Sequence, residues 1–536
     1  MPNKPAETAT GAAGASYVLT IDLGSGGPKA GLVSASGEVV AVAARKSDTL
    51  FLPNGGAEQD PNQWWQGALA AAKEVLATAH VSKKAVRAIA CTSQWSVTVA
   101  VDANGDALMN AVCWMDTRGG KYNRALTRGF PSVQGYNLPK LFRWIRLTGL
   151  APTHTGADAL GHILFIKNER PDIYARTHKF LEPMDYLTMR LTGRMSATQH
   201  TTAPLMLVDN RTWNCCDYID TLVKTAGLEK AKLPDLIPNN AVVGPLLPSL
   251  ADELGLRPST PVMAGINDTS ASVIGCGAVN LFEGIIYIGT SLVLTCHLPF
   301  KKTDLLHMLT AMPNPLKSKY LLMAEQGTGG KSLEFFLEQI VFAKDAFASG
   351  ALPEDVYTRV NQVANTVPAG SEGVLFLPWL NGTLTPQENA TARGAFYNLS
   401  LKSTRSHMTR ALMEGLAFNS RWTLGPAQKF IGRSFPHFRF AGGGALSDVW
   451  AQIHADIMGV PILQIADPTS VTLRGAAFLS FHFLDGHPLE SLADGVAIKR
   501  VFEPDLNNKR CYDRLYAQFR QIYKRNKKIF AALNAN

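Results

Sequence analysis

The strongest constraint on the fold is a strand, a turn of small residues and a second strand, which occurs twice in the chain. Residues 17–22 and 29–33 are apolar strands that flank a glycine-rich turn at 24–28, and a similar pair spans 284–295. Glycine suits such turns because the backbone reverses there at positive φ. The repeat predicts two related α/β domains with a boundary near residue 280.

Other segments of the first half alternate between strands and helices. Asp60 followed by Pro61 is typical of a helix N-terminus, and the amphipathic pattern extends to about residue 79. Residues 86–91 and 97–101 are predicted strands. A chain of 536 residues also exceeds one ordinary core, so we expect at least two domains.

Composition indicates a globular protein of a reducing compartment. The chain is 46% hydrophobic and 18% charged, and its seven cysteines are scattered without a CxxC pair. Residues 1–16 lack the apolar core of a secretion signal and are predicted to be a disordered leader. Residues 271–296 are apolar, but glycines divide them into short pieces, which favours buried strands over a membrane helix. We expect a cytoplasmic protein without a membrane partner.

The net charge of +9 raises the question of nucleic-acid binding. Residues 499–528 hold ten Lys/Arg against three acidic residues, but no nucleic-acid-binding motif accompanies them. The pattern predicts a terminal helix with a solvated basic face. Its docked face would consist of Tyr512, Leu515, Phe519, Tyr523 and Phe530. We therefore expect no nucleic-acid partner.

The first turn combines features that suit phosphate binding. Gly24 and Gly26 let backbone N–H groups approach phosphate oxygens, Ser25 adds a hydroxyl and Lys29 adds charge. Asp22, at the strand end, is a candidate to hold Mg²⁺ through water. An ordinary tight hairpin explains the same residues.

Two later motifs also allow chemistry. Asp268 follows an apolar strand and is either a general base or the cap of the helix that begins next. Three glycines at 442–444 precede a helix and would let a flat ring and its phosphates approach the backbone. Gly330-Lys331-Ser332 is not a P-loop, because Glu325 occupies the position of the first glycine.

Taken together, these elements resemble the FGGY carbohydrate kinases, especially the xylulokinase branch, over about residues 17–523. The most specific match is 394–399 followed by 407–414, where Asn398 replaces the usual glycine. Further matches are Glu58–Pro61 with Trp64-Trp65, Trp114-Met-Asp116, residues 174–180, residues 185–193 and residues 377–382.

The resemblance implies an α/β fold of two actin-like, ribonuclease-H-like ATPase domains with an interdomain cleft. It implies that residues 17–280 form the sugar-binding, catalytic domain and that residues 281–536 form the nucleotide-binding domain. ATP and Mg²⁺ would be the cofactors, and a small sugar or polyol the partner, with a homodimer as a candidate assembly.

The resemblance also implies roles for individual residues. Asp268 matches the general base and Asp22 the carboxylate associated with the metal. The implied substrate-binding residues are Gln94, Trp95, Ser96, Asp116 and Asp268. The implied nucleotide-binding residues are Asp22, Gly24, Ser25, Gly26, Lys29, Gly289, Thr290, Gly330, Gly443, Gly444 and Asp448.

Departures from the family pattern bear on the substrate. Trp95 and Ser96 stand where xylulokinases carry Met-His and glycerol kinases carry Arg-Glu, which disfavours glycerol and leaves xylulose open. We expect ATP-dependent phosphorylation of a ketopentose such as xylulose, or of a related ketose or polyol. The alternative is an inactive nucleotide-binding homologue with a regulatory or scaffolding role. An actin-like ATPase or chaperone would share the fold but not the signature near His407.

Overall fold

The computed structural model describes residues 16–346 and 350–534 and separates into two compact units. Unit 1 comprises the chain up to Lys140, Pro152–Ala271 and Thr472–Gly495, and unit 2 comprises Leu141–Ala151, Ser272–Val471 and the chain from Val496 onward. Each unit is thus assembled from segments distant in sequence, which differs from a single boundary near residue 280. The predicted leader, apart from Ser16, lies outside the described residues.

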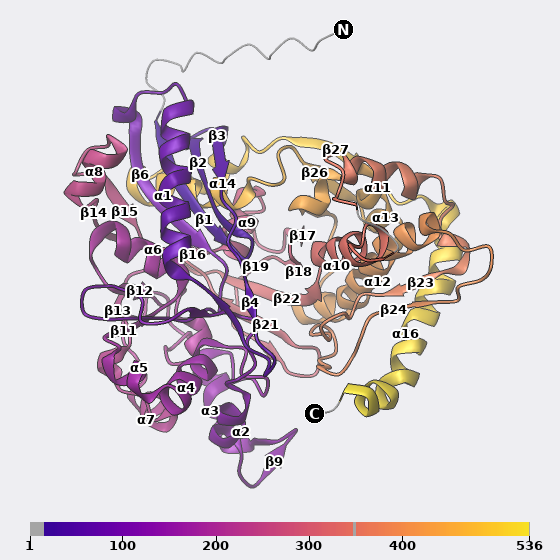
Figure 1. Ribbon diagram of the computed structural model, residues 1–536, viewed down its shortest axis with the longest axis horizontal. Coiled ribbons are helices and arrows are strands. Elements are labelled where there is room, and N and C mark those ends of the chain that lie inside the picture. Colours follow the sequence, from indigo (N-terminus) through magenta and orange to yellow (C-terminus); the bar gives the residue numbers. More distant parts are fainter. Residues whose placement is uncertain (1–15, 347–349, 535–536) are drawn as a thin grey trace. The chain divides into compact units, whose positions relative to one another are not determined.

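The main sheet of unit 1 is built around the first predicted hairpin (Figure 1). Strands β1 (Tyr17–Gly24) and β2 (Gly27–Ser34) are antiparallel, and β6 (Val86–Ser93) runs parallel to β1. The full order is β14-β15-β6-β1-β2-β3, with β16 also paired to β6. The remaining strands are β3 (Val39–Ala44), β14 (Val242–Pro245), β15 (Pro261–Met263) and β16 (Ile266–Asn267).

Three helices of unit 1 matter for the site. Helix α1 (Pro61–Thr78) packs against β2 and β3, and Asp60 caps it by accepting the N–H of Asn62, as predicted. The other two are α6 (Pro183–Thr192) and α9 (Asp268–Gly275), of which only the part up to Ala271 belongs to unit 1.

Helix α14 (Val471–Asp485) brings a late part of the chain back to unit 1. A Cβ at Gly475 would lie 1.8 Å from the carbonyl oxygen of Ala271 in α9. Glycine is therefore required for the close approach of these two helices, which places the start of α14 beside the first hairpin.

The sheet of unit 2 repeats the arrangement of unit 1, which confirms the predicted duplication. Strands β17 (Gly284–Ile288) and β18 (Ser291–Thr295) are antiparallel, and β25 (Phe438–Ala441) runs parallel to β17. The order is β20-β21-β22-β18-β17-β25-β26-β27, with β19 beside β22. The other strands are β19 (His297–Leu298), β20 (Thr303–Asp304), β21 (Leu309–Pro313), β22 (Tyr320–Thr328), β26 (Ile462–Ile465) and β27 (Ile498–Phe502).

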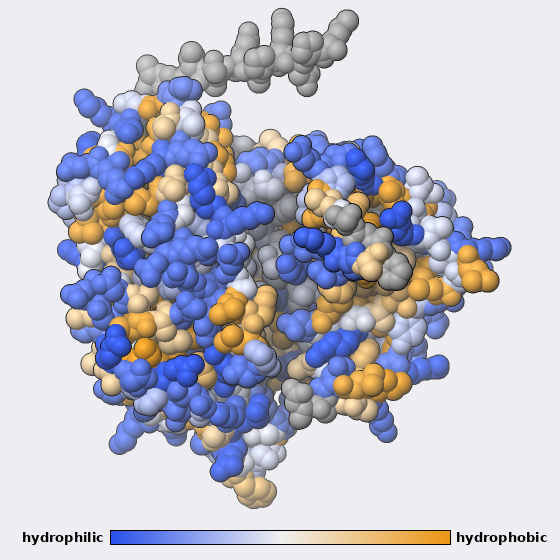
Figure 2. Space-filling view, viewed as in Figure 1, coloured by the Kyte–Doolittle hydropathy of each residue, from blue (hydrophilic) through white to orange (hydrophobic). Residues whose placement is uncertain are grey.

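Each unit has its own apolar core, one built around β1 and α1 and the other around β17 and the long helix α12 (Arg405–Ile431). On the face that Figure 2 shows, hydrophilic residues cover most of the surface and apolar residues form small groups. Among the described residues, no helix is both long and apolar enough to span a membrane. The apolar stretch 271–296 instead contributes to α9 and forms β17 and β18.

The terminal helix α16 (Leu506–Asn534, yellow in Figure 1) confirms the predicted amphipathic pattern. Its buried residues are the five predicted: Tyr512, Leu515, Phe519, Tyr523 and Phe530. Phe519 and Tyr523 contact the rings of Trp379 and Trp422, so α16 completes the core of unit 2.

A buried ion pair within α12 is hydrogen-bonded to Tyr512 of α16. Arg410 Nε lies 2.8 Å from Glu414 Oε1, which also accepts the hydroxyl of Tyr512 at 2.9 Å. The N–H of Gly370 and the hydroxyl of Ser371 donate to the same carboxylate. Every oxygen of Glu414 is therefore paired, which is the condition for a buried charge to be tolerated.

We predict that Glu414→Gln destabilises unit 2 by about 3–5 kcal/mol, because Arg410 is left as a buried charge without its counter-ion. Chemical unfolding followed by tryptophan fluorescence measures the effect. Asp355→Asn is the matched control, since Asp355 and Arg359 form a pair of the same spacing with more than half of each side chain exposed. Equal unfolding midpoints for the two variants would contradict the prediction.

Candidate active site

Asp22 lies at the end of β1, directly across the hairpin from Lys29. Lys29 Nζ is 3.4 Å from Asp22 Oδ2, and the hydroxyl of Thr472, at the start of α14, donates to the same oxygen at 2.6 Å. The other oxygen, Oδ1, is buried and has no hydrogen-bond partner among the described residues. The carboxylate is therefore held firmly on one side and has an unsatisfied acceptor on the other.

An unsatisfied buried carboxylate oxygen fits a magnesium ion chemically. Mg²⁺ prefers oxygen ligands and is bound in many phosphate-transfer sites through one or two carboxylates, with water and phosphate completing the shell. Asp22 Oδ1 meets that requirement. The metal role of Asp22 stays a prediction.

The turn after β1 is open on the side where a phosphate is expected. A Cβ at Gly24 or Gly26 would meet nothing within 4 Å. Gly27, with φ +121°, is different, because a Cβ there would lie 2.2 Å from the carbonyl oxygen of Arg45. The turn therefore needs glycine at 27 for its conformation and leaves 24 and 26 accessible.

Ser25 is tied to Gln94 by a closed set of hydrogen bonds. Its hydroxyl donates to Gln94 Oε1 at 3.0 Å and accepts the indole N–H of Trp114 at 3.2 Å. Gln59 completes the set by donating to the carbonyl oxygen of Ser25 and accepting from Gln94. A predicted phosphate residue and a predicted substrate residue thus lie in direct contact.

The loop that follows Gln94 places Trp95 against His200. Ser96 has φ +61°, and the indole N–H of Trp95 donates to the carbonyl oxygen of Thr201 at 3.0 Å. The rings of Trp95 and His200 have centroids 5.7 Å apart, and His200 Nε2 accepts the N–H of Asn267 at 3.4 Å. His200 was not predicted, because no motif in the sequence marks it.

Asp268 is the first residue of α9. The residue before it, Asn267, caps the helix, because its Oδ1 accepts the N–H of Ser270 at 2.7 Å. The Asp268 carboxylate accepts the hydroxyl of Thr269 at 3.2 Å, and its role as a base stays a prediction.

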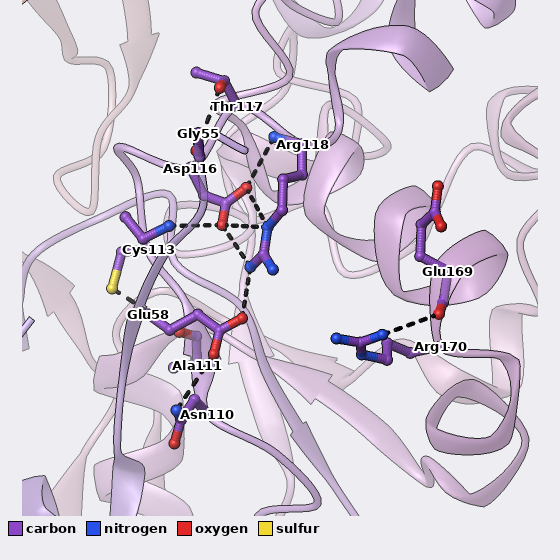
Figure 3. Close-up of polar contacts among 11 residues, drawn as sticks. Gly55, Glu58, Asn110, Ala111, Cys113, Asp116, Thr117, Arg118, Glu169 and Arg170 are labelled. Atoms are coloured by element: carbon purple, nitrogen blue, oxygen red, sulfur yellow. Dashed lines mark hydrogen bonds and ion pairs between the residues drawn. The ribbon is translucent and has the colours of Figure 1, made fainter. Parts of the chain in front are cut away.

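Asp116 is fully buried in an ion-pair cluster (Figure 3). Its carboxylate accepts the N–H of Ala57 and the guanidinium of Arg118, whose NH2 also contacts Glu58 at 2.7 Å. The guanidinium lies over the ring of Phe165. Asp116 thus orients Arg118, which was not predicted, and a direct substrate contact by Asp116 stays a prediction.

Three predicted nucleotide-binding residues of unit 2, Gly289, Thr290 and Gly330, lie close to one another. The N–H of Gly330 donates to the carbonyl oxygen of Gly289 at 2.7 Å, and that of Gly329 donates to Thr290 at 2.9 Å. A Cβ at Gly330 would lie 2.7 Å from the oxygen of Gly289. The turn after β17 therefore packs directly on the start of α10 (Gly330–Phe336).

The triple glycine adjoins the same strand end. Cβ atoms at Gly442 and Gly444 would clash with Ile288, whereas one at Gly443 would meet nothing within 4 Å. Gly443 therefore presents an open backbone surface of the kind that a flat ring requires. Asp448, the first residue of α13 (Asp448–Met458), pairs with Lys499 at 3.0 Å.

Glu182 is a buried carboxylate that supports the Trp95 loop, and sequence reasoning missed it. Its Oε2 accepts the N–H of Val97 at 3.0 Å, while Oε1 has no partner among the described residues. Burial raises the pKa of Glu182 well above its ordinary value, with the nearby Asp185 as a smaller cause. Burial also raises the pKa of Asp185.

We predict that Glu182→Gln becomes progressively more stabilising, relative to the unchanged protein, as pH rises from 5 to 8. A carboxyl whose pKa is raised by folding is favoured in its protonated form, so its ionisation destabilises the fold as pH increases. Glutamine keeps an acceptor for Val97 and cannot ionise. Thermal unfolding at several pH values measures the difference.

Glu169→Gln is the control, because Lys121 lowers the pKa of this exposed carboxylate. Glu169 stays ionised over the same range, so its variant should differ from the unchanged protein by a constant amount. Parallel curves for Glu182→Gln would contradict the prediction.

Comparison with known proteins identifies the family. The N-terminal domain model of the FGGY family of carbohydrate kinases matches residues 17–275, and the C-terminal domain model matches residues 284–483. A xylulose kinase from Bacillus subtilis is 26% identical over 532 residues, covering 97% of this chain and 99% of the relative.

Solved structures agree with this result. A ligand-bound xylulose kinase from Lactobacillus acidophilus has a TM-score of 0.81 at 23% identity, with 97% of this chain and 100% of that chain covered. The xylulose kinase from Rhodospirillum rubrum has a TM-score of 0.78 at 25% identity, with 96% and 99% covered. The fold is thus that of two actin-like domains, and the chain belongs to the FGGY family of carbohydrate kinases.

Proposed function

We propose that this carbohydrate kinase transfers the γ-phosphoryl group of ATP to a hydroxyl of a ketopentose such as xylulose, or of a related ketose or polyol. The observation that carries the proposal is the position of Asp268. It is the first residue of α9, directly after the edge of the sheet at β16, where the resemblance places the general base. The xylulose kinases among the similar proteins support the substrate class.

In this proposal, residues of unit 1 provide the general base, the phosphate contacts and the metal ligand. Asp268 takes the proton of the attacking hydroxyl, and the turn at Ser25 and Gly26 receives phosphate oxygens, with Lys29 contributing positive charge. Asp22 would hold Mg²⁺ with Oδ1, and bound Mg²⁺ would offset phosphate charge. Positioning and charge neutralisation provide most of the acceleration in phosphoryl transfer.

Residues of unit 2 bind the rest of the nucleotide in this proposal. Gly289 and Thr290 receive phosphate, and the open backbone at Gly443 contacts the adenine ring. The remaining proposed nucleotide-binding residues are Gly330, Gly444 and Asp448. The predicted assignment of sugar binding to the N-terminal half and of nucleotide binding to the C-terminal half is part of the proposal.

Trp95 is proposed as the wall against which the sugar stacks. Its indole is held by Thr201, so a flat apolar face is fixed in place, and His200 lies beside it. Such a face suits the C–H surface of a five- or six-carbon sugar better than a three-carbon polyol. The proposal therefore favours ketoses over glycerol.

A second candidate, a nucleotide-binding homologue without turnover, is favoured by one observation: the Ser25 hydroxyl is already bonded to Gln94. The retention of carboxylates at both 22 and 268 favours an active enzyme instead. The cytoplasmic location stays a prediction. The homodimer stays a prediction.

We predict that Asp268→Asn lowers sugar-dependent ADP release by about 10²- to 10⁴-fold, the usual contribution of a general base. The assay is run against ketopentoses, ketohexoses, tetritols, pentitols and glycerol. Asp220→Asn is the matched control, because Asp220 is also the first residue of a helix in unit 1, α7 (Asp220–Ala226). Normal turnover by Asp268→Asn would refute the base assignment, whereas nucleotide binding without any turnover by the unchanged protein would favour the inactive homologue.

We also predict that Trp95→Ala lowers kcat/KM for the best sugar by about tenfold, roughly 1.4 kcal/mol of lost stacking. Trp95→Phe keeps an aromatic face and should recover part of the loss. Nucleotide affinity should not change in either variant. A kcat/KM that is unaffected by both changes would exclude Trp95 as the sugar wall.

A further inference from the structure

For each hydrogen bond around Ser25, the donor and the acceptor can be assigned, because the Ser25 carbonyl can only accept and the Trp114 indole N–H can only donate. The carbonyl oxygen of Ser25 can only accept, so the group of Gln59 that contacts it at 2.8 Å must be the amide NH₂. The same NH₂ donates to the hydroxyl of Thr49 at 2.9 Å. Gln59 Oε1 is therefore the atom that faces Gln94.

The assignment continues through Gln94 to the Ser25 side chain. Gln94 must present its NH₂ to Gln59 Oε1, at 2.8 Å, which turns Gln94 Oε1 toward Ser25. An indole N–H can only donate, so the hydroxyl oxygen of Ser25 accepts from Trp114. The single hydroxyl proton of Ser25 is consequently committed to Gln94.

This commitment affects the proposed phosphate turn. While the Ser25 hydroxyl donates its hydrogen bond to Gln94 Oε1, it cannot donate to a phosphate oxygen. Gln59 and Gln94 are both buried, at 2% and 3% exposed, so the arrangement is enclosed by packing. Gln94 also immediately precedes Trp95, the proposed sugar wall.

We propose that Gln94 couples sugar binding to phosphate binding. A sugar hydroxyl that donates to Gln94 Oε1 replaces Ser25 there, and the Ser25 hydroxyl then donates to a phosphate oxygen of the nucleotide. Hydrogen bonds are exchanged and no covalent bond changes. Gln59 and Trp114 are positioning residues, because they fix the orientation of Gln94 and of the Ser25 oxygen.

The positions of sugar and phosphate in this scheme rest on the proposed function. The size of the coupling follows from one hydrogen bond, which changes an equilibrium constant by about 2- to 12-fold. By linkage, the nucleotide must increase sugar affinity by the same factor.

The test frees the Ser25 hydroxyl from its hydrogen bond to Gln94 in the absence of sugar. Gln94→Leu removes the acceptor, so the full-length variant should bind Mg²⁺ with the non-hydrolysable ATP analogue AMP-PNP about 2- to 12-fold more tightly than the unchanged protein. Isothermal titration calorimetry measures both dissociation constants. The double variant Ser25→Ala/Gln94→Leu should lose the gain, because no hydroxyl is left to donate.

Trp114→Phe is the matched control, since it removes a hydrogen bond at the same hydroxyl without releasing the proton from Gln94. It should show no gain in affinity. Thermal unfolding verifies that each variant is folded, and Gln94→Met, with a side chain of similar length, serves if Gln94→Leu is not.

Unchanged or weaker analogue binding by a folded Gln94 variant would overturn the coupling, and so would a gain that persists without the Ser25 hydroxyl. Absence of turnover across the sugar panel would overturn the proposed function but would leave the gain in analogue affinity intact. The two failures are therefore distinguishable.

Discussion

The site depends on the contact between Asp22 and Thr472, which lie 450 residues apart in the sequence. Thr472 reaches Asp22 because α14 returns to unit 1, and α14 can do so because Gly475 lets it approach Ala271 of α9 closely. The same helix α9 begins with Asp268. One packing arrangement of β1, α9 and α14 therefore positions both the proposed metal ligand, Asp22, and the proposed base, Asp268.

Local patterns in the sequence predicted the elements that depend on local physics. The glycine-flanked strands predicted both hairpins, and helical spacing of aromatic residues predicted the buried face of α16. Asp60 followed by Pro61 predicted the start of α1. Each of these signals is contained within a few turns of helix or one hairpin, so a single sequence suffices to show it.

Features that arise from tertiary packing could not be predicted in the same way. The return of residues 472–495 to unit 1 and the position of His200 beside Trp95 both join distant segments. Asn267 and Asp268 are adjacent and both residue types are good caps, so the sequence alone does not show that Asn267 accepts the N–H of Ser270. Glu182 carries no motif, and its importance becomes visible through burial and its bond to Val97.

The central claim is that Asp268 is the base that receives the proton of the reacting hydroxyl. A crystal structure with Mg²⁺, AMP-PNP and the best sugar of the panel tests it most directly. We expect a carboxylate oxygen of Asp268 about 2.6–3.2 Å from the hydroxyl that faces the γ-phosphate. A hydroxyl bonded instead to another side chain, with Asp268 directed away from it, would contradict the claim.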